Sequence, residues 1–189
     1  MTRDYVVIVS GMPRSGTSLM MQMLNAGGIA PLTDGIRKSD EHNPHGYLEY
    51  EPVKRLAYDS SWVPDARGKA LKVIYRLLPH LPPEVDYRVI LMDRDIEQVF
   101  ESQRDMLRTR GDAAADQHKD RIIKALAAEI EDTKEWLSEQ PNVRVLAVPY
   151  ASLVRDPAFW SQMVTHFLDG GLNERAMAAM VVPSLYRHR

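Results

Sequence analysis

Four short runs of mainly apolar residues divide the chain. They cover residues 5–9, 70–74, 88–92 and 143–148. Runs of this length, bounded by Gly, Pro, Asn or Asp, are typical of strands buried in a sheet. The pattern therefore predicts four strands with long connections between them.

Helical spacing of apolar residues follows several of these runs. It covers residues 95–107 and 117–139, where apolar positions recur every three or four residues. Asp156 and Pro157 are typical of an N-cap and a first helical position, and they open a helix to about Leu168. Because strands that alternate with helices favour a parallel sheet covered on both faces, we expect an α/β fold in three layers, with a central parallel sheet of four or five strands.

The first apolar run leads straight into a loop rich in Gly, Ser and Thr, and then into a helix that begins near Leu19. Backbone N–H groups of such a loop converge on an anion, and the helix N-terminus adds a positive partial charge. This order of strand, loop and helix predicts a P-loop-type domain that binds a phosphorylated ligand. The loop residues are Met12, Pro13, Arg14, Ser15, Gly16, Thr17 and Ser18.

The loop differs at one position from the ATP- and GTP-binding pattern G-x-x-x-x-G-K-[ST]. Gly11 and Gly16 have the required spacing, and Ser18 occupies the final position. Thr17 stands where that pattern has the lysine that reaches the outer phosphates. A cation occurs earlier, at Arg14, so we expect the positive charge of this site to come from a different place.

A second strand-to-helix junction carries another cation. The run 88–92 is followed by Asp93 and Arg94, and the predicted helix places Ser102 eight residues after Arg94. Ligands of α/β sheets bind at the carboxyl ends of the strands. A guanidinium and a hydroxyl two helical turns apart can hold one phosphate from two sides.

Composition limits the classes of protein that the chain can represent. At 189 residues it can form one domain with a full core, and we expect a single domain over residues 1–189. The net charge of −2 gives no reason to expect nucleic acid or an anionic membrane as a partner. The chain has no cysteine, which excludes disulfides and thiolate chemistry. No apolar run is long enough for a signal peptide or a membrane span, so we expect a cytoplasmic protein.

These motifs together resemble the sulfotransferases that use 3′-phosphoadenosine-5′-phosphosulfate (PAPS) as the sulfuryl donor. The loop from Pro13 to Ser18 is similar to the family's 5′-phosphosulfate motif P-[KR]-[ST]-G-[ST]-[ST], and Arg94 with Ser102 is similar to its 3′-phosphate motif. Further similar segments are NPHGYLEYEPV at 43–53, the Tyr150-x-x-Leu153 pair followed by Asp156-Pro157, and Pro183 to Arg187.

The resemblance implies in-line transfer of a sulfuryl group to a hydroxyl or amine. PAPS would be the donor and adenosine 3′,5′-bisphosphate (PAP) the product, with no metal required. The acceptor would be a small molecule or a carbohydrate. The chain departs from the cytosolic members in having Leu19 in place of an adenine-stacking Trp, and in having Lys72-Val73-Ile74 in place of a K-T-H segment with its catalytic His.

Three residues are the predicted catalytic groups. Arg14 lies where negative charge develops on the leaving phosphate, and Lys72 is either a second such cation or a solvated lysine at a strand end. Glu49, in the GYLE segment, is the predicted general base, with a pKa raised toward neutrality by partial burial. His42 and His45 are the rival bases.

Two other functions fit parts of the sequence. The apolar strand that ends at Asp93 is like a magnesium-binding Walker B strand, which favours a P-loop nucleotide kinase or NTPase. The absent K-T-H histidine favours a non-catalytic nucleotide-binding module of the same fold. The sequence does not decide whether the basic tail 187–189 reaches the donor or whether the chain forms a homo-oligomer.

Overall fold

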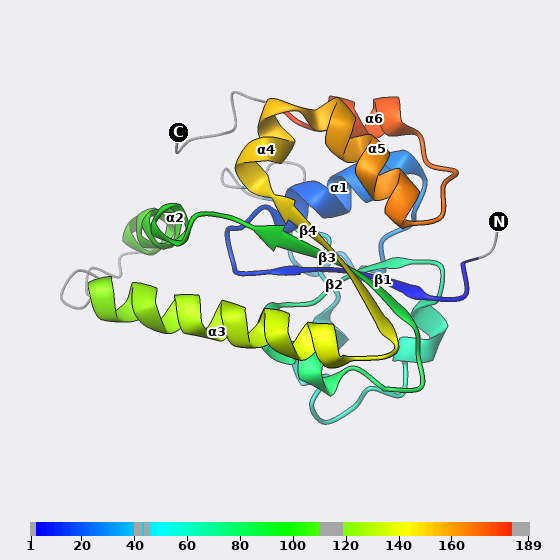
Figure 1. The fold of residues 1–189 in the computed structure, drawn as a ribbon, viewed down its shortest axis with the longest axis horizontal. Helices are drawn as coiled ribbons and strands as arrows, with labels where there is room; N and C mark the ends of the chain where they lie inside the picture. Colours follow the sequence, from blue (N-terminus) through cyan, green and yellow to red (C-terminus); the bar gives the residue numbers. More distant parts are fainter. Residues whose placement is uncertain (1–2, 40–42, 44–45, 110–118, 183–189) are drawn as a thin grey trace.

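The computed structural model of the chain describes residues 3–39, 43, 46–109 and 119–182. Its centre is a sheet of four strands in the order β2-β1-β3-β4, and each neighbouring pair is parallel (Figure 1). The predicted α/β fold with a parallel sheet is therefore confirmed. The strands are β1 Val6–Gly11, β2 Ala70–Lys72, β3 Tyr87–Asp93 and β4 Val143–Pro149.

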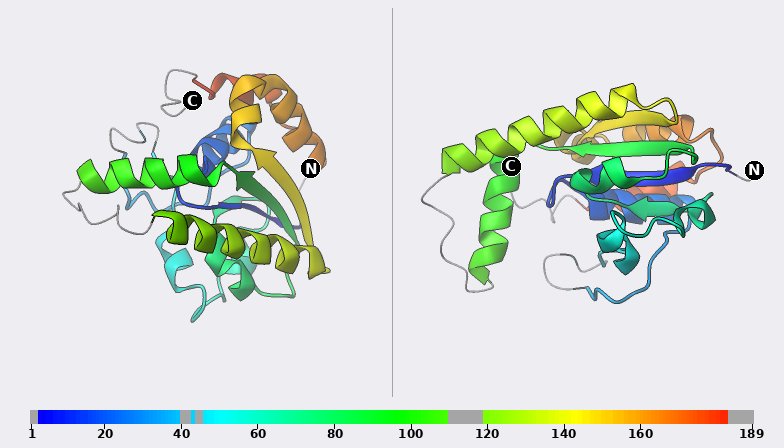
Figure 2. Two further views of the ribbon diagram at one scale, coloured as in Figure 1. Left: turned by 60° about the vertical axis from the view of Figure 1, so that its left-hand side comes forward. Right: turned by 90° about the horizontal axis from the view of Figure 1, so that it is seen from below.

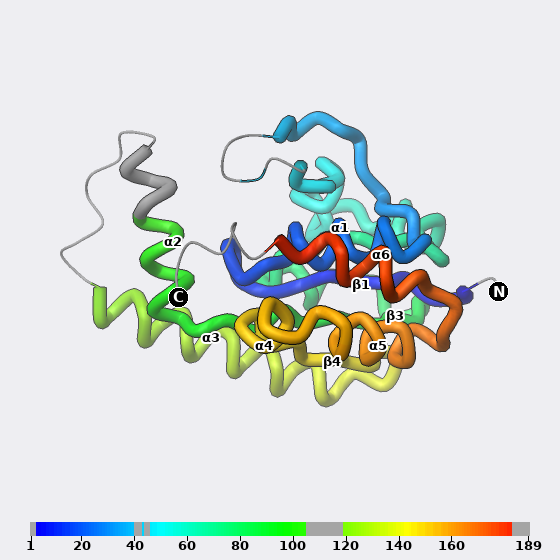
Figure 3. The backbone as a smooth tube through the Cα atoms, turned by 90° about the horizontal axis from the view of Figure 1, so that it is seen from above, coloured from blue at the N-terminus to red at the C-terminus, as the bar shows by residue number. Residues whose placement is uncertain are grey.

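Helices cover both faces of this sheet. In the described part of the chain the α-helices are α1 Thr17–Gly27, α2 Ile96–Thr109, α3 Lys119–Glu139, α4 Tyr150–Arg155, α5 Pro157–Phe167 and α6 Glu174–Ala179. Short 3₁₀-helices lie in the connections on either side of β2, at η1 Glu51–Arg55, η2 Val63–Ala66 and η3 Tyr75–His80. Figures 1 and 3 show α1, α4, α5 and α6 on one side of the sheet and α3 on the other.

The position of β1 in the middle of the sheet explains why its sequence is continuously apolar. Val6 and Ile8 pack into one buried cluster with residues of α3 and the 3₁₀-helices, whereas Val7 and Val9 pack into a second cluster with α1, α5 and α6. All four side chains are fully buried. Burial on both faces removes the need for polar alternation, as expected for the inner strand of a parallel sheet.

The carboxyl ends of the parallel strands lie at one edge of the sheet. Gly11 at the end of β1 is in register with Met92 near the end of β3, and Asp93 with Pro149 at the end of β4. The helix α2 leaves β3 at this edge and extends away from the sheet (Figure 2). Every loop that connects a strand to its following helix is therefore brought to the same edge.

The predicted second strand was too long at its C-terminal end. Strand β2 ends at Lys72, although the Val73 amide still donates a hydrogen bond to the Val9 carbonyl (3.0 Å). Ile74 is 42% exposed and precedes η3, so the chain has already left the sheet. Within the described ranges no helix has both the length and the apolar character needed to cross a membrane.

Replacement of Ile8 by Ala should destabilise the fold strongly, because this side chain is fully buried in the central strand. We expect a loss of about 2–5 kcal/mol in the free energy of unfolding, measured by urea denaturation. Ile122→Ala is the matched control, since Ile122 is 38% exposed on α3. Equal losses for the two variants would contradict the placement of β1 at the centre of the core.

Candidate functional site

The loop after β1 folds back tightly on the end of β3. Gly11 has a φ of +145°, and a Cβ there would lie 2.6 Å from Ser15 Oγ and 2.7 Å from the Met92 carbonyl oxygen. The Ser15 amide donates a hydrogen bond to the Met12 carbonyl (3.1 Å), which closes the turn. Only glycine allows this approach, so Gly11 fixes the direction in which the loop leaves the sheet.

The centre of the loop holds a buried hydroxyl that lacks a hydrogen-bond partner in the described structure. Ser15 is 1% exposed, and its Oγ has no partner among the described residues; the same is true of Ser10 Oγ at the end of β1. Buried hydroxyls are nearly always hydrogen-bonded, so these two atoms are expected to bond to a ligand or to water. Ser15 lies just before the N-terminus of α1, where backbone N–H groups and the helix dipole favour an anion.

Arg14 connects this loop to helix α2. Arg14 has a φ of +74°, which is uncommon for a residue with a Cβ. Its Nε donates a hydrogen bond to Ser102 Oγ (3.0 Å), and Gln103 Nε2 donates one to the Pro13 carbonyl (3.2 Å). Ser102 is 4% exposed. The strained backbone therefore turns the Arg14 side chain toward α2, where the hydroxyl of Ser102 receives it.

Arg94 reaches the same loop from the end of β3. Its Nη1 donates a hydrogen bond to the Arg14 carbonyl oxygen (2.9 Å), and its Nε donates a weaker one to Gln98 Oε1 (3.3 Å). Its guanidinium carbon lies 4.8 Å from the centre of the Tyr150 ring, a cation–π contact. The structure thus places both Arg94 and Ser102 in contact with Arg14, and their binding of a phosphate stays a prediction.

The role of Tyr150 could not be foreseen from the sequence. The residue follows β4, and a Cβ on Gly16 would lie 2.4 Å from its ring. Tyr150 therefore forms a wall that packs directly against the loop backbone. A groove of about 410 Å³ begins beside Tyr150 and Arg94 and continues past Gln98 and Lys134.

Lys72 supplies a second cation from the neighbouring strand. Its side chain is 11% exposed, and its Nζ donates hydrogen bonds to Ser18 Oγ (3.1 Å) and to Glu49 Oε1 (3.0 Å). Burial lowers the pKa of Lys72, and the charge of Glu49 opposes this effect. Of the two interpretations of Lys72, the solvated strand-end lysine is wrong.

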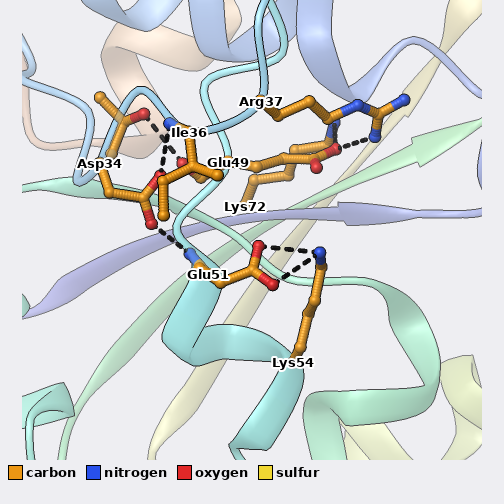
Figure 4. Close-up of polar contacts among 8 residues, drawn as sticks. Asp34, Ile36, Arg37, Glu49, Glu51, Lys54 and Lys72 are labelled. Atoms are coloured by element: carbon orange, nitrogen blue, oxygen red, sulfur yellow. Dashed lines mark hydrogen bonds and ion pairs between the residues drawn. The ribbon is translucent and has the colours of Figure 1, made fainter.

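One carboxylate oxygen of Glu49 accepts hydrogen bonds from two cations. Arg37 Nη1 donates to Glu49 Oε1 (2.7 Å), the same atom that accepts from Lys72 (Figure 4). Burial raises the pKa of Glu49, but the charges and hydrogen bonds of Lys72 and Arg37 outweigh it and hold the pKa below its usual range. The predicted rise of this pKa toward neutrality is therefore wrong, because the sequence did not show how closely the two cations approach.

Arg37 was missed by the sequence analysis. It lies on the face of the buried Tyr47 ring, with 3.4 Å between its guanidinium carbon and the ring centre. The buried Gln22 of α1 holds the chain that follows Arg37. Its Nε2 donates hydrogen bonds to Asn43 Oδ1 (3.1 Å) and to the Gly46 carbonyl (3.0 Å).

Glu51 belongs to a separate cluster. Its carboxylate pairs with Lys54, and its amide donates to Asp34 Oδ2 (2.6 Å), as Figure 4 shows. The rival bases His42 and His45 and the basic tail 187–189 lie outside the described residues. Among the residues described, no three His, Asp or Glu side chains gather as a metal site would require.

The chain resembles known proteins in sequence and in fold. The sequence matches the family model described as a sulfotransferase domain over residues 4–185. No curated protein sequence is significantly similar to the chain.

Several solved structures share the fold. The sulfotransferase domain of the olefin synthase of Synechococcus PCC 7002 is 16% identical with a TM-score of 0.54, and the match covers 100% of this chain and 84% of that one. The sulfotransferase domain from the curacin biosynthetic pathway is 15% identical with a TM-score of 0.57, covering 100% and 80%. Mouse sulfotransferase SULT7A1, solved in complex with PAP, is 18% identical with a TM-score of 0.54, covering 95% and 63%.

Gly16 and Gly28 provide a matched pair of substitutions, because their φ angles are +102° and +104°. Replacement by Ala should cost about 1–2 kcal/mol at either position through left-handed backbone strain. Only Gly16→Ala should cost more, since a Cβ at Gly28 meets nothing within 4 Å whereas one at Gly16 meets Tyr150. Urea unfolding of both variants measures the difference, and equal losses would show that Tyr150 does not pack on the loop.

Proposed function

The chain belongs to the sulfotransferase family, and from this we propose that it moves a sulfuryl group from PAPS to a hydroxyl or amine acceptor. The observation that carries the proposal is that Arg14, Lys72 and the Ser15 hydroxyl, which has no partner among the described residues, all lie at one loop at the start of α1. Two cations, a hydroxyl without a partner and a helix N-terminus suit a doubly charged phosphosulfate.

We assign the two ends of the donor to two parts of the site. The loop from Pro13 to Ser18 would hold the 5′-phosphosulfate through its backbone amides and hydroxyls. Arg94 and Ser102 would hold the 3′-phosphate, because both already lie beside Arg14. A neighbour with the same fold, mouse SULT7A1, was solved with PAP, which supports a nucleotide with both phosphates.

The side chains of this site suit in-line transfer. PAPS supplies an activated sulfur whose bond to the 5′-phosphate oxygen breaks as the acceptor oxygen or nitrogen bonds to sulfur. Arg14, Lys72 and the loop amides would stabilise the negative charge that develops on the leaving phosphate oxygen. Glu49 would take the acceptor's proton, and no residue of this scheme needs a metal.

The lowered pKa of Glu49 has a consequence for this step. An ionised carboxylate is ready to accept a proton at neutral pH, but its two cations weaken it as a base. A donor anion near Ser18 would compete with Glu49 for the ammonium of Lys72. Because the donor carries more negative charge than one carboxylate, Lys72 would move toward the donor and away from Glu49. Glu49 would thereby become more basic when the donor is bound.

The kinase alternative has less support. Thr17 holds the position of the nucleotide-binding lysine and is largely buried, and the cation that bonds to Ser18 comes from β2.

Calorimetric titration with PAP and with ATP plus magnesium separates the two functions. Tight binding of PAP together with sulfuryl transfer to any of a panel of alcohols, phenols and amines supports a sulfotransferase. Binding of PAP without transfer would favour the non-catalytic module.

Substitution of Arg94 tests the assignment of the 3′-phosphate. A charge-assisted contact contributes about 1.5–3 kcal/mol, so Arg94→Ala should weaken PAP binding by roughly tenfold or more. Binding of adenosine 5′-monophosphate should change much less, because it lacks the 3′-phosphate. Arg67→Ala is the control, since the partners of Arg67 among the described residues are the exposed Asp4 and the carbonyl of Pro64. Equal losses for both nucleotides would show that Arg94 acts only by bracing the loop.

Substitution of Glu49 tests the base. Glu49→Gln keeps the shape of the side chain but removes its basicity, so turnover should fall by roughly 10²–10⁴-fold. The affinity for PAP should stay nearly unchanged, measured by calorimetry. Glu51→Gln is the control, because this carboxylate pairs with Lys54 and not with Lys72. Near-normal turnover of Glu49→Gln would move the role to another residue, first to His45.

A further inference from the structure

Arg37 has no part in the proposed reaction, although it contacts the predicted base. Its guanidinium bonds to Glu49 Oε1 at 2.7 Å and lies on the Tyr47 ring at 3.4 Å. The Tyr47 side chain is buried, with 5% of its surface exposed, so it offers a fixed platform. Arg37 therefore has a defined position although its own side chain is 40% exposed.

The two cations that bond to Glu49 differ in their second contacts. Lys72 also bonds to Ser18 in the loop, so a donor anion in that loop competes with Glu49 for its ammonium. No described residue of loop 12–18 contacts Arg37, whose partners in the described structure are Glu49 and the Tyr47 ring. When Lys72 turns to the donor, Arg37 is the cation that still holds Glu49.

Both bonds also end on the same carboxylate oxygen. Oε2 of Glu49 accepts no hydrogen bond from any described residue, whereas Oε1 accepts two. An incoming proton needs an oxygen that is free of donors. Two donors on Oε1 restrain the carboxylate, and among the described residues they leave Oε2 as the oxygen that is open to a proton.

We propose that Arg37 is the positioning residue of the catalytic base: it anchors Glu49 Oε1 and leaves Oε2 to take the acceptor's proton while Lys72 serves the donor. The proposal rests on the proposed function of Glu49. In the transfer, the acceptor oxygen or nitrogen bonds to sulfur, the bond from sulfur to the phosphate oxygen breaks, and the acceptor's proton moves to Glu49 Oε2.

The charges near Glu49 give the sign of the expected pH effect. Arg37 from the same connection and Lys72 from β2 contact the carboxylate, Lys54 from η1 is a more distant cation, and Arg14 faces Lys72 from the loop. Removal of the Arg37 charge takes away one cation that favours the ionised form. The carboxyl of Glu49 should therefore titrate at a higher pH in Arg37→Gln than in the unsubstituted protein.

A titration of the carboxyl itself tests the proposal without an acceptor. The protein is labelled with ¹³C at the glutamate carboxyls, and the Glu49 signal is identified as the one that Glu49→Gln lacks. We expect a higher pKa in Arg37→Gln, a return toward the original value in Arg37→Lys, and no change in Arg67→Gln. Arg67 is a matched control, since it is 38% exposed and makes a surface ion pair. An unchanged Glu49 titration in Arg37→Gln would overturn the proposal.

Kinetics then separate positioning from a general structural role. In sulfuryl transfer from PAPS, the acidic limb of the pH profile should move to higher pH in Arg37→Gln, and turnover should fall by roughly 10–10²-fold, less than the loss for Glu49→Gln. The affinity for PAP should stay within about twofold of the original. A uniform loss at every pH, or a parallel loss of PAP binding, would make Arg37 structural and overturn the proposal.

Failure of the proposed donor and failure of the positioning role of Arg37 give different results. If the unsubstituted protein does not bind PAP, the proposed donor is wrong, and the carboxyl titration still decides whether Arg37 controls Glu49. If PAP binds and is consumed but the Glu49 titration ignores Arg37, the proposed function stands and the positioning role is excluded.

Discussion

The site depends on one steric constraint, the absence of a Cβ at the two glycines that flank the loop after β1. At Gly11 a side chain would overlap Ser15 and the Met92 carbonyl, and at Gly16 it would overlap the Tyr150 ring. Because neither position carries a side chain, the loop can lie against the ends of β3 and β4. The residues that follow those strands, Arg94 and Tyr150, can then contact the loop itself.

This close approach allows three strands to contribute charge to one place. Arg14 lies in the loop after β1, Lys72 is the last residue of β2 and bonds to Ser18, and Arg94 follows β3 and bonds to the Arg14 carbonyl. Like charges at short range repel, so their arrangement requires neutralising groups. Glu49 supplies one beside Lys72, and the remaining positive charge favours a ligand that carries several negative charges.

The sequence was informative wherever a function depends on residues that are close along the chain. The loop from Pro13 to Ser18 and the spacing of Arg94 and Ser102 are local patterns, and the structure brings both to the same sheet edge. The pairing of Lys72 with Glu49 crosses 23 positions and that of Arg37 with Glu49 crosses 12, through connections without periodicity. No local pattern encodes such distances, which is why the pKa of Glu49 was predicted in the wrong direction and Arg37 was missed.

Glu49 can act as a base although two cations bond to it, because Lys72 and Arg37 have different second contacts. A carboxylate held by two permanent cations would be too weak to take a proton, and one held by none would lack orientation. Lys72 also bonds to Ser18 of the loop, whereas the second contact of Arg37 among the described residues is the Tyr47 ring. Negative charge in the loop therefore weakens one bond to Glu49 and leaves the other. In this way donor binding would raise the basicity of Glu49 while its orientation is kept, which couples the two halves of the proposed reaction through a single carboxylate oxygen.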